Sequence, residues 1–238
     1  GATLICDGQV VASVSEERLT RRKNEVGYPK NAIEDVLRIG GVEASQLTEI
    51  VYASLFMHSN QYLTELDGWY KVGIAQQREN EASPNEYQKI IFNERKRERI
   101  AVAARHLGVD ESKIHFIEHH LAHLAAAYFT APGPLSGKPV LGLTCDGAGD
   151  GLCATVSRCL DNKIERLAAT DRHASLGKIY SRVTFLLGMT PWEHEYKLMG
   201  LAPYADPDRS KSAAGKLREL LKVRADGLGF DQVGELST

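Results

Sequence analysis

Two histidines four residues apart are the strongest chemical signal in the chain. His119 and His123 stand in the segment Glu118-His-His-Leu-Ala-His123, which is compatible with a helix. On a helix these two positions lie about 40° apart around the axis, so both imidazoles can reach one metal ion. His120 with His123 is a competing pair at i,i+3, and capping or core histidines are the alternative to any metal site.

An aspartate after an apolar strand supplies a third ligand. Asp146 ends the run Val140-Leu-Gly-Leu-Thr-Cys145 and opens Asp146-Gly-Ala-Gly-Asp150, at the kind of strand end where ligands of open α/β sheets gather. Gly147 and Gly149 let a phosphate or an ion approach the backbone closely, and a plain turn is the alternative. Two histidines with an aspartate suit Fe(II), Mn(II) or Zn(II) and leave positions open for substrate oxygens.

Three other segments offer weaker candidate sites. The basic stretch from Arg18 to Lys23 holds cations that bind phosphate or carboxylate groups when they cluster, and a solvated charged turn is the alternative. Ser175-Leu-Gly177 and Gly200-Leu-Ala-Pro203 are helix-edge turns that face either a nucleotide or ordinary packing neighbours.

Composition argues against several classes of protein. Of the 238 residues 43% are hydrophobic, enough for a core, and 29 basic residues nearly balance 31 acidic ones, so a nucleic-acid partner is not expected. No stretch approaches the about 18 uninterrupted apolar residues of a membrane span, and the beginning lacks a signal-peptide pattern. We therefore expect a cytoplasmic protein with no membrane partner. The four cysteines form no C-x-x-C pair, which predicts buried thiols.

The elements that must position these residues alternate between strands and helices. Asp7-Gly8 between two β-branched runs predicts a β-hairpin, and the polar residues 56–84 predict loops or short helices. Strand, helix and strand around a Gly-rich turn are typical of an α/β layer fold. The other expected strands are Ile50–Ser54, Ile114–Ile117, Val140–Cys145, Leu152–Val156 and Ile164–Ala168, the last three forming a meander. One expected helix begins near Asn31 and another begins after Gly177. The other expected helices cover Glu86–Leu107, His120–Thr130, Lys197–Ala202 and Ser210–Val223.

Four motifs resemble one family in the same order along the chain. The family is that of the O-carbamoyltransferases of nodulation-factor, cephamycin and aminoglycoside biosynthesis. The resemblance runs from residue 2 to about residue 205, and four collinear motifs are more specific than any one of them. The opening block, metal-binding helix, acidic turn and later blocks are Asp7–Lys23 with Gly27–Ile33, Glu118–Tyr128, Asp146–Asp150, and Ser175–Tyr180 with Glu195–Tyr204.

The resemblance implies an α/β fold of the ribonuclease-H-like type seen in actin and Hsp70, with a mixed sheet flanked by helices and ATP between two lobes. The implied domain is similar to the tRNA threonylcarbamoyl-adenosine transferase domain. We expect residues 1–135 to form the first lobe, with a helical insertion at 56–110, and residues 136–238 to begin the second. A His-Asp motif, a fourth metal ligand and an adenylate-forming domain are expected outside this sequence, which by itself would not turn over.

In that family carbamoyl phosphate and ATP yield a carbamoyl-adenylate, and the carbamoyl group then passes to a hydroxyl of a small-molecule acceptor. Carried over by position, the resemblance implies that His119, His123 and Asp146 bind a divalent metal, with iron expected. It also implies that Lys23 contacts carbamoyl or phosphate oxygens, a catalytic role. The expected nucleotide-site residues are Gly147, Gly149, Asp150, Ser175 and Gly177.

Two other functions remain open at this point. One is a relative of the threonylcarbamoyl-adenosine transferases that modify tRNA, although the lack of a basic patch argues against a tRNA partner. The other is a non-catalytic actin-like module that binds a nucleotide or a partner protein. Stoichiometric iron or zinc would separate an enzyme from such a module.

Overall fold

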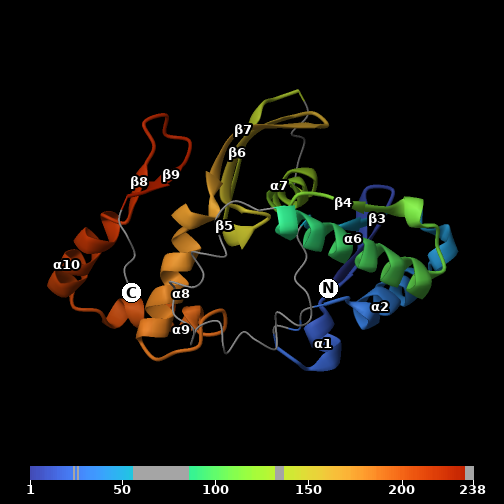
Figure 1. The fold of residues 1–238 in the computed structure, drawn as a ribbon, viewed down its shortest axis with the longest axis horizontal. Helices are drawn as coiled ribbons and strands as arrows, with labels where there is room; N and C mark the ends of the chain where they lie inside the picture. Colours follow the sequence, from blue (N-terminus) through green and yellow to red (C-terminus); the bar gives the residue numbers. More distant parts are fainter. Residues whose placement is uncertain (24, 26, 56–85, 132–136, 234–238) are drawn as a thin grey trace. The chain divides into compact units, whose positions relative to one another are not determined.

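The computed structural model describes residues 1–23, 25, 27–55, 86–131 and 137–233. These residues form a mixture of helices and strands (Figure 1), which confirms the α/β class. The chain divides into two compact units, Gly1–Ile117 and Glu118–Ser237. The boundary between these units comes just before the histidine-rich helix, and the division into lobes after residue 135 stays a prediction. Of the insertion predicted at residues 56–110, residues 56–85 lie outside the described residues.

The first unit opens with the predicted hairpin. Asp7 and Gly8 at its turn have φ values of 49° and 75°, the left-handed conformation that a primed turn requires. Leu4 and Ala12 from the two strands are buried against Val36 of the helix Lys30–Gly40. These three residues form a small hydrophobic core. The elements of the first unit are β1 (Ala2–Cys6), β2 (Gln9–Val14), α1 (Glu16–Thr20), α2 (Lys30–Gly40), η1 (Ala44–Gln46), β3 (Ile50–Tyr52), α6 (Glu86–Leu107), η2 (Glu111–Lys113) and β4 (Ile114–Phe116).

A buried carboxylate joins α1 to α2. Glu16 is 7% exposed, and its side chain accepts the backbone N–H groups of Asn31 at 3.2 Å and Ala32 at 2.7 Å. These are donors that the first turn of a helix leaves without an intrahelical partner. Pro29, at the N-cap of α2, offers no side-chain acceptor, so a residue from another helix performs the capping.

The long helix α6 is tied to α2 by a histidine. Nδ1 of His106 lies 2.8 Å from the Tyr28 hydroxyl, and its Nε2 lies 3.1 Å from Glu34. Burial raises the pKa of Tyr28, so the phenol stays protonated and donates to Nδ1. Both ring nitrogens of His106 thus have a polar partner next to α2.

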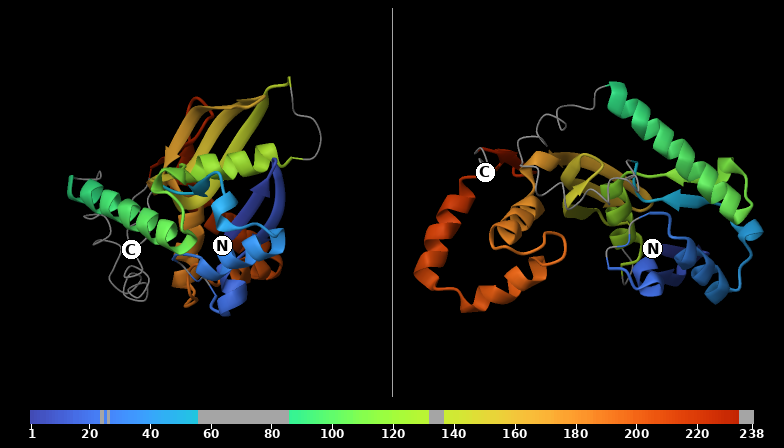
Figure 2. Two further views of the ribbon diagram at one scale, coloured as in Figure 1. Left: turned by 90° about the vertical axis from the view of Figure 1, so that its right-hand side faces the viewer. Right: turned by 60° about the horizontal axis from the view of Figure 1, so that its bottom comes forward.

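The second unit is built around an antiparallel sheet with the order β5-β6-β7, the predicted meander. Helices α7 and α8 both pack against β5, and Figure 2 (left) shows α7, in yellow-green, beside this sheet. The elements of the second unit are α7 (His119–Phe129), β5 (Val140–Gly149), β6 (Leu152–Leu160), β7 (Lys163–Asp171), η3 (Arg172–Ala174), α8 (Leu176–Leu186), α9 (Glu195–Leu201), η4 (Ala202–Tyr204), α10 (Pro207–Arg218), β8 (Leu221–Val223) and β9 (Phe230–Gln232).

Alternate residues of β5 face α7. Gly142 leaves room for Leu124, because a Cβ at Gly142 would lie 2.5 Å from Cδ1 of that leucine. Two residues further along the strand, the Thr144 hydroxyl lies 2.9 Å from Nδ1 of His120. Two residues further again comes Asp146. Because alternate residues of a strand share one face, Gly142, Thr144 and Asp146 all lie on the face of β5 that contacts α7.

One expected helix has other bounds in the structure. The predicted helix Ser210–Val223 begins earlier and ends at Arg218, and Leu221–Val223 instead pairs with Phe230–Gln232 as a short hairpin. The partner strand is contributed by residues that the local helical pattern does not include. Within the described ranges the largest sheet has three strands, so the single mixed sheet of a ribonuclease-H-like fold stays a prediction. Among these residues no helix combines the length and apolar character that a membrane crossing needs.

The cap supplied by Glu16 predicts a stability effect. In Glu16→Gln the amide keeps one acceptor oxygen in place of two, so at least one buried N–H at the start of α2 loses its partner. We expect the free energy of unfolding, measured by urea denaturation, to fall by about 1–3 kcal/mol. Glu111→Gln, at an exposed position in the same unit, should change it by less than about 0.5 kcal/mol. Equal effects of the two substitutions would contradict the capping role.

Candidate metal centre

Helix α7 begins at His119 because two carboxylates satisfy its first turn. Glu118 stands at the N-cap in extended conformation, and its side chain accepts the N–H groups of His120 and Leu121, both at 2.9 Å. The Asp150 carboxylate accepts the N–H of His119 at 2.7 Å. Negative charge at the positive end of a helix adds to these hydrogen bonds. The position of the first turn, which carries the candidate ligand His119, is thereby fixed.

Asp146 lies within β5 rather than beyond its end. Pairing with β6 is regular as far as Cys145 and resumes at Gly149, so residues 146–148 form a bulge. The sequence predicts a strand that ends at Cys145, and the difference arises because the ladder continues after the bulge. A bulge re-aims side chains, and here the aspartate carboxylate is directed to α7.

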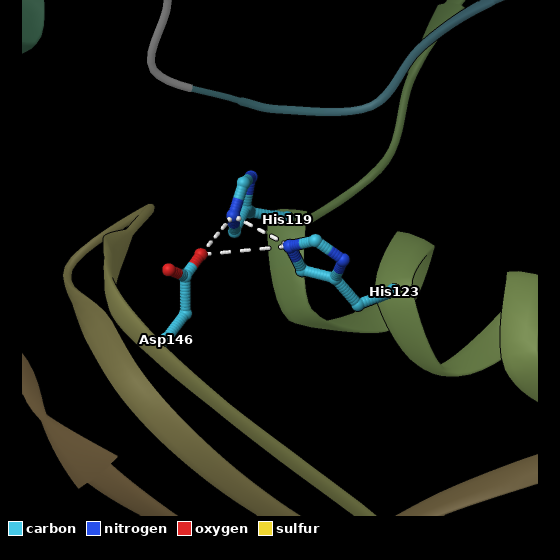
Figure 3. A group of neighbouring side chains, drawn as sticks. All are labelled: His119, His123 and Asp146. Carbon is cyan, nitrogen blue, oxygen red and sulfur yellow. Dashed lines mark hydrogen bonds and ion pairs between the residues drawn. The ribbon is translucent and has the colours of Figure 1, made fainter. Parts of the chain in front are cut away.

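His119, His123 and Asp146 converge on one point (Figure 3). The Nε2 of His119 lies 2.8 Å from Oδ2 of Asp146 and 3.0 Å from Nε2 of His123, and Nε2 of His123 lies 3.5 Å from the same Oδ2. Ligand atoms bound at about 2.1 Å from one ion are about 3.0 Å apart in octahedral and about 3.4 Å apart in tetrahedral geometry. The three atoms are therefore spaced like ligands of a shared cation.

Hydrogen bonds alone cannot satisfy all three of these polar atoms. A neutral imidazole nitrogen presents either one N–H or one lone pair in the ring plane. The Nε2 of His119 faces both an acceptor oxygen and the Nε2 of His123, and a single N–H cannot point at two atoms in different directions. A cation that receives a lone pair from each of the three atoms satisfies all of them together. Two nitrogens and one oxygen, with no thiolate, suit a divalent ion such as iron, manganese or zinc.

The aspartate is held in the form that binds a cation. Burial opposes ionisation of the Asp146 carboxyl, but hydrogen bonds from His119 and from the backbone N–H of Gly147 outweigh it and lower its pKa. The two neighbouring imidazoles act in the same direction. At neutral pH the group is therefore a carboxylate, with negative charge available to a metal ion.

His120 does not join this cluster. Its side chain is fully buried, with Nδ1 against the Thr144 hydroxyl, which in turn lies 2.7 Å from the hydroxyl of Thr155. Its Nε2 has no hydrogen-bond partner among the described residues. The competing i,i+3 pair of His120 and His123 is thus not formed, because His120 belongs to the stripe of α7 that packs on the sheet.

A glycine makes room for the first ligand. A Cβ at Gly149 would lie 1.9 Å from Cδ2 of His119, so a larger residue there would displace the imidazole. Asp150 follows at φ 50° and binds the His119 backbone as described above. These two residues, expected at a nucleotide site, thus also contact the residue that carries the first histidine ligand.

The start of α8 lies directly against the bulge of β5. A Cβ at Gly177 would lie 2.8 Å from the Cα of Gly147. Ser175 caps α8 by accepting the N–H of Lys178 at 3.1 Å, and its hydroxyl donates to the backbone oxygen of Asp146 at 3.2 Å. The structure therefore brings Gly147, Ser175 and Gly177 together beside the candidate metal ligand.

Lys23 lies in the other compact unit, after α1. It lines a surface hollow together with Glu17, Arg18 and Arg21. Three cationic side chains around one hollow suit an anion such as a phosphate or a carboxylate group. Helix α1 covers the beginning of this basic stretch and ends at Thr20.

Arg166 contributes to the N-terminal cap of α7, and the sequence alone does not identify it. Its guanidinium pairs with the carboxylate of Glu118, from which 48 residues separate it in the chain. An acidic residue before a helix is a local signal for capping, but no local pattern identifies its partner on β7.

The room left by Gly149 predicts an effect on metal affinity. In Gly149→Ala the new methyl group overlaps the His119 ring, which must turn away from the cluster. We expect the dissociation constant for cobalt(II), measured by titration calorimetry, to rise at least about tenfold. Gly215→Ala on α10, where a Cβ meets no atom within 4 Å, should leave it unchanged. Unchanged affinity in the first variant would show that the ring position does not matter.

Known proteins resemble this chain over nearly its whole length. The family model described as "Carbamoyltransferase N-terminus" matches residues 1–233. The nodulation protein NolNO of Sinorhizobium fredii is 30% identical over 236 residues, which are 98% of this chain and 32% of that protein. The uncharacterized protein sll1178 of Synechocystis is 29% identical over 228 residues, 95% of this chain and 36% of that protein. The chain thus spans about a third of the length of these relatives. With a match that covers residues 1–233, it belongs to the carbamoyltransferase N-terminus family.

Proposed function

We propose that this chain supplies the metal centre and part of the nucleotide site of an O-carbamoyltransferase. The observation that carries the proposal is the convergence of His119, His123 and Asp146 on one point. Membership of the carbamoyltransferase family supports the reaction class. The metal is proposed to be iron, which the donor set accommodates and the resemblance implies.

The proposed reaction joins carbamoyl phosphate to ATP. One water molecule is consumed, phosphate and pyrophosphate are released, and a carbamoyl-adenylate is formed. The hydroxyl oxygen of a small acceptor then attacks the carbonyl carbon and loses its proton. The bond from that carbon to the adenylate oxygen breaks, and AMP leaves with the electron pair. A bound divalent cation would stabilise negative charge on the substrate oxygens as a Lewis acid.

Four side chains have roles in this proposal. His119, His123 and Asp146 hold the ion in a fixed place, which is more effective than water for charge that develops during reaction. Lys23 contacts the carbamoyl or phosphate oxygens, and its place among cations lining one hollow supports an anionic ligand. The hydroxyl group of the acceptor belongs to a small molecule rather than to a nucleic acid, in keeping with the balanced charge of the chain.

The nucleotide phosphates are proposed to lie at the start of α8. A helix N-terminus offers free N–H groups and a positive dipole end, and Gly147 leaves the approach to it without a side chain. Gly149, Asp150, Ser175 and Gly177 complete the proposed site, in direct or supporting roles. The ribonuclease-H-like fold that binds this nucleotide is part of the proposal and rests on the family resemblance.

Metal content tests the centre directly. Protein prepared under reducing conditions should contain about one iron or zinc ion per chain by elemental analysis, because three ligands converge on one ion. We expect His119→Ala, His123→Ala and Asp146→Ala each to lose at least about tenfold in affinity, since each removes one of the three bonds.

His115→Ala is the matched control, because His115 is exposed and pairs only with Glu49 among the contacts described. It should retain the wild-type metal content. Absence of stoichiometric metal from the wild type, or full retention in His119→Ala, would contradict the proposed centre.

The reaction is tested on the full protein that contains this chain. Pyrophosphate release from ATP should depend on carbamoyl phosphate. Lys23→Ala should lower the kcat/KM for carbamoyl phosphate by about 100-fold or more, because a fixed cation at the reacting anion is lost. Lys163→Ala, at the exposed first position of β7, is the control and should behave as the wild type. Pyrophosphate release that ignores carbamoyl phosphate would overturn the reaction.

A further inference from the structure

The carboxylate of Glu118 makes contacts in two directions. One oxygen accepts the N–H of His120, and the other accepts the N–H of Leu121. The second oxygen also pairs with the guanidinium of Arg166. The two charged side chains are 16% and 36% exposed, so the pair is partly withdrawn from water and is screened less than a surface pair.

These contacts anchor the first turn of α7 to the sheet. Arg166 belongs to β7, the strand on the far side of the sheet from β5. Asp150, which binds the N–H of His119, belongs to the turn between β5 and β6. The start of the helix is therefore held from two separate places, and its rotation about its own axis is restricted.

That rotation decides whether the ligands meet. Bonds from a metal to histidine nitrogen vary by only about 0.2 Å, whereas a small turn of the helix moves an imidazole tip by more than this. His119 belongs to the very turn that Glu118 caps, and His123 follows one turn later. The ligand geometry is thus sensitive to a side chain that does not itself contact the cluster.

We propose that Glu118, held by Arg166, is a positioning residue for the metal centre. It fixes the first turn of α7 and thereby aims His119 and His123 at Asp146. The inference rests on the proposed function in one respect, since it requires that these three residues bind a metal ion.

A second cap in the same unit separates positioning from simple helix stability. Asp206 caps α10 by accepting the N–H groups of Asp208 at 3.1 Å and Arg209 at 2.9 Å. Helix α10 carries none of the three candidate ligands. Glu118→Ala and Asp206→Ala therefore each remove a carboxylate cap with two backbone hydrogen bonds, and only the first is expected to disturb the metal centre.

The experiment is a titration of the full chain with cobalt(II), followed by its ligand-field absorption, which reports the arrangement of the ligands. Glu118→Ala should raise the dissociation constant by about 10- to 100-fold, keep a stoichiometry of one, and shift the absorption bands. Asp206→Ala should match the wild type in both respects. Wild-type affinity and an unchanged spectrum in Glu118→Ala would overturn the inference.

Arg166→Gln provides a second variant that leaves both capping bonds in place. It should weaken cobalt(II) binding by at least about threefold, because the carboxylate loses the partner that holds it. This variant decides the matter if Glu118→Ala does not fold, and an unchanged affinity and spectrum would then refute the positioning role. A wild-type chain that binds no cobalt(II) would instead refute the proposed metal centre.

Discussion

The register of α7 on β5 determines whether the site exists. Thr144 contacts His120, and Asp146, two residues further along the strand, contacts His119. A slip of the strand by one residue would turn the aspartate to the opposite face of the sheet. A rotation of the helix by one position, about 100°, would direct a different side chain to the carboxylate. Only one pairing of helix and strand therefore brings two imidazoles and a carboxylate to the same point.

Close backbone approach is the second constraint, and it links the candidate metal ligands to the start of α8. Gly149 admits the ring of His119, while Gly177 allows the first turn of α8 to lie on Gly147. Asp146 is close to both contacts, because its carboxylate contacts His119 and Gly147 follows it in the chain. Under the proposed function, a cation and the positive end of a helix would act on the same polyanionic substrate from neighbouring positions, where fixed charges and dipoles stabilise developing negative charge.

Local sequence signals predict helices and turns well, but they do not predict which distant residues contact one another. The Asp7-Gly8 turn and the helix Glu86–Leu107 follow from turn chemistry and hydrophobic periodicity, and both are confirmed. Glu16 as the cap of α2 and Arg166 as the partner of Glu118 depend on residues far away in the chain, so no local pattern identifies them. The ribonuclease-H-like plan stays a prediction because it depends on long-range strand pairing beyond the small sheets of the described residues.

The proposed metal centre requires that three side chains on α7 and β5 share one metal ion. Anomalous diffraction at the absorption edge of the metal, from crystals of iron- or manganese-loaded protein, tests it most directly. We expect one peak about 2.0–2.3 Å from Nε2 of His119, Nε2 of His123 and a carboxylate oxygen of Asp146. A peak bound elsewhere, or two imidazoles that point into separate surroundings with no peak between them, would contradict it.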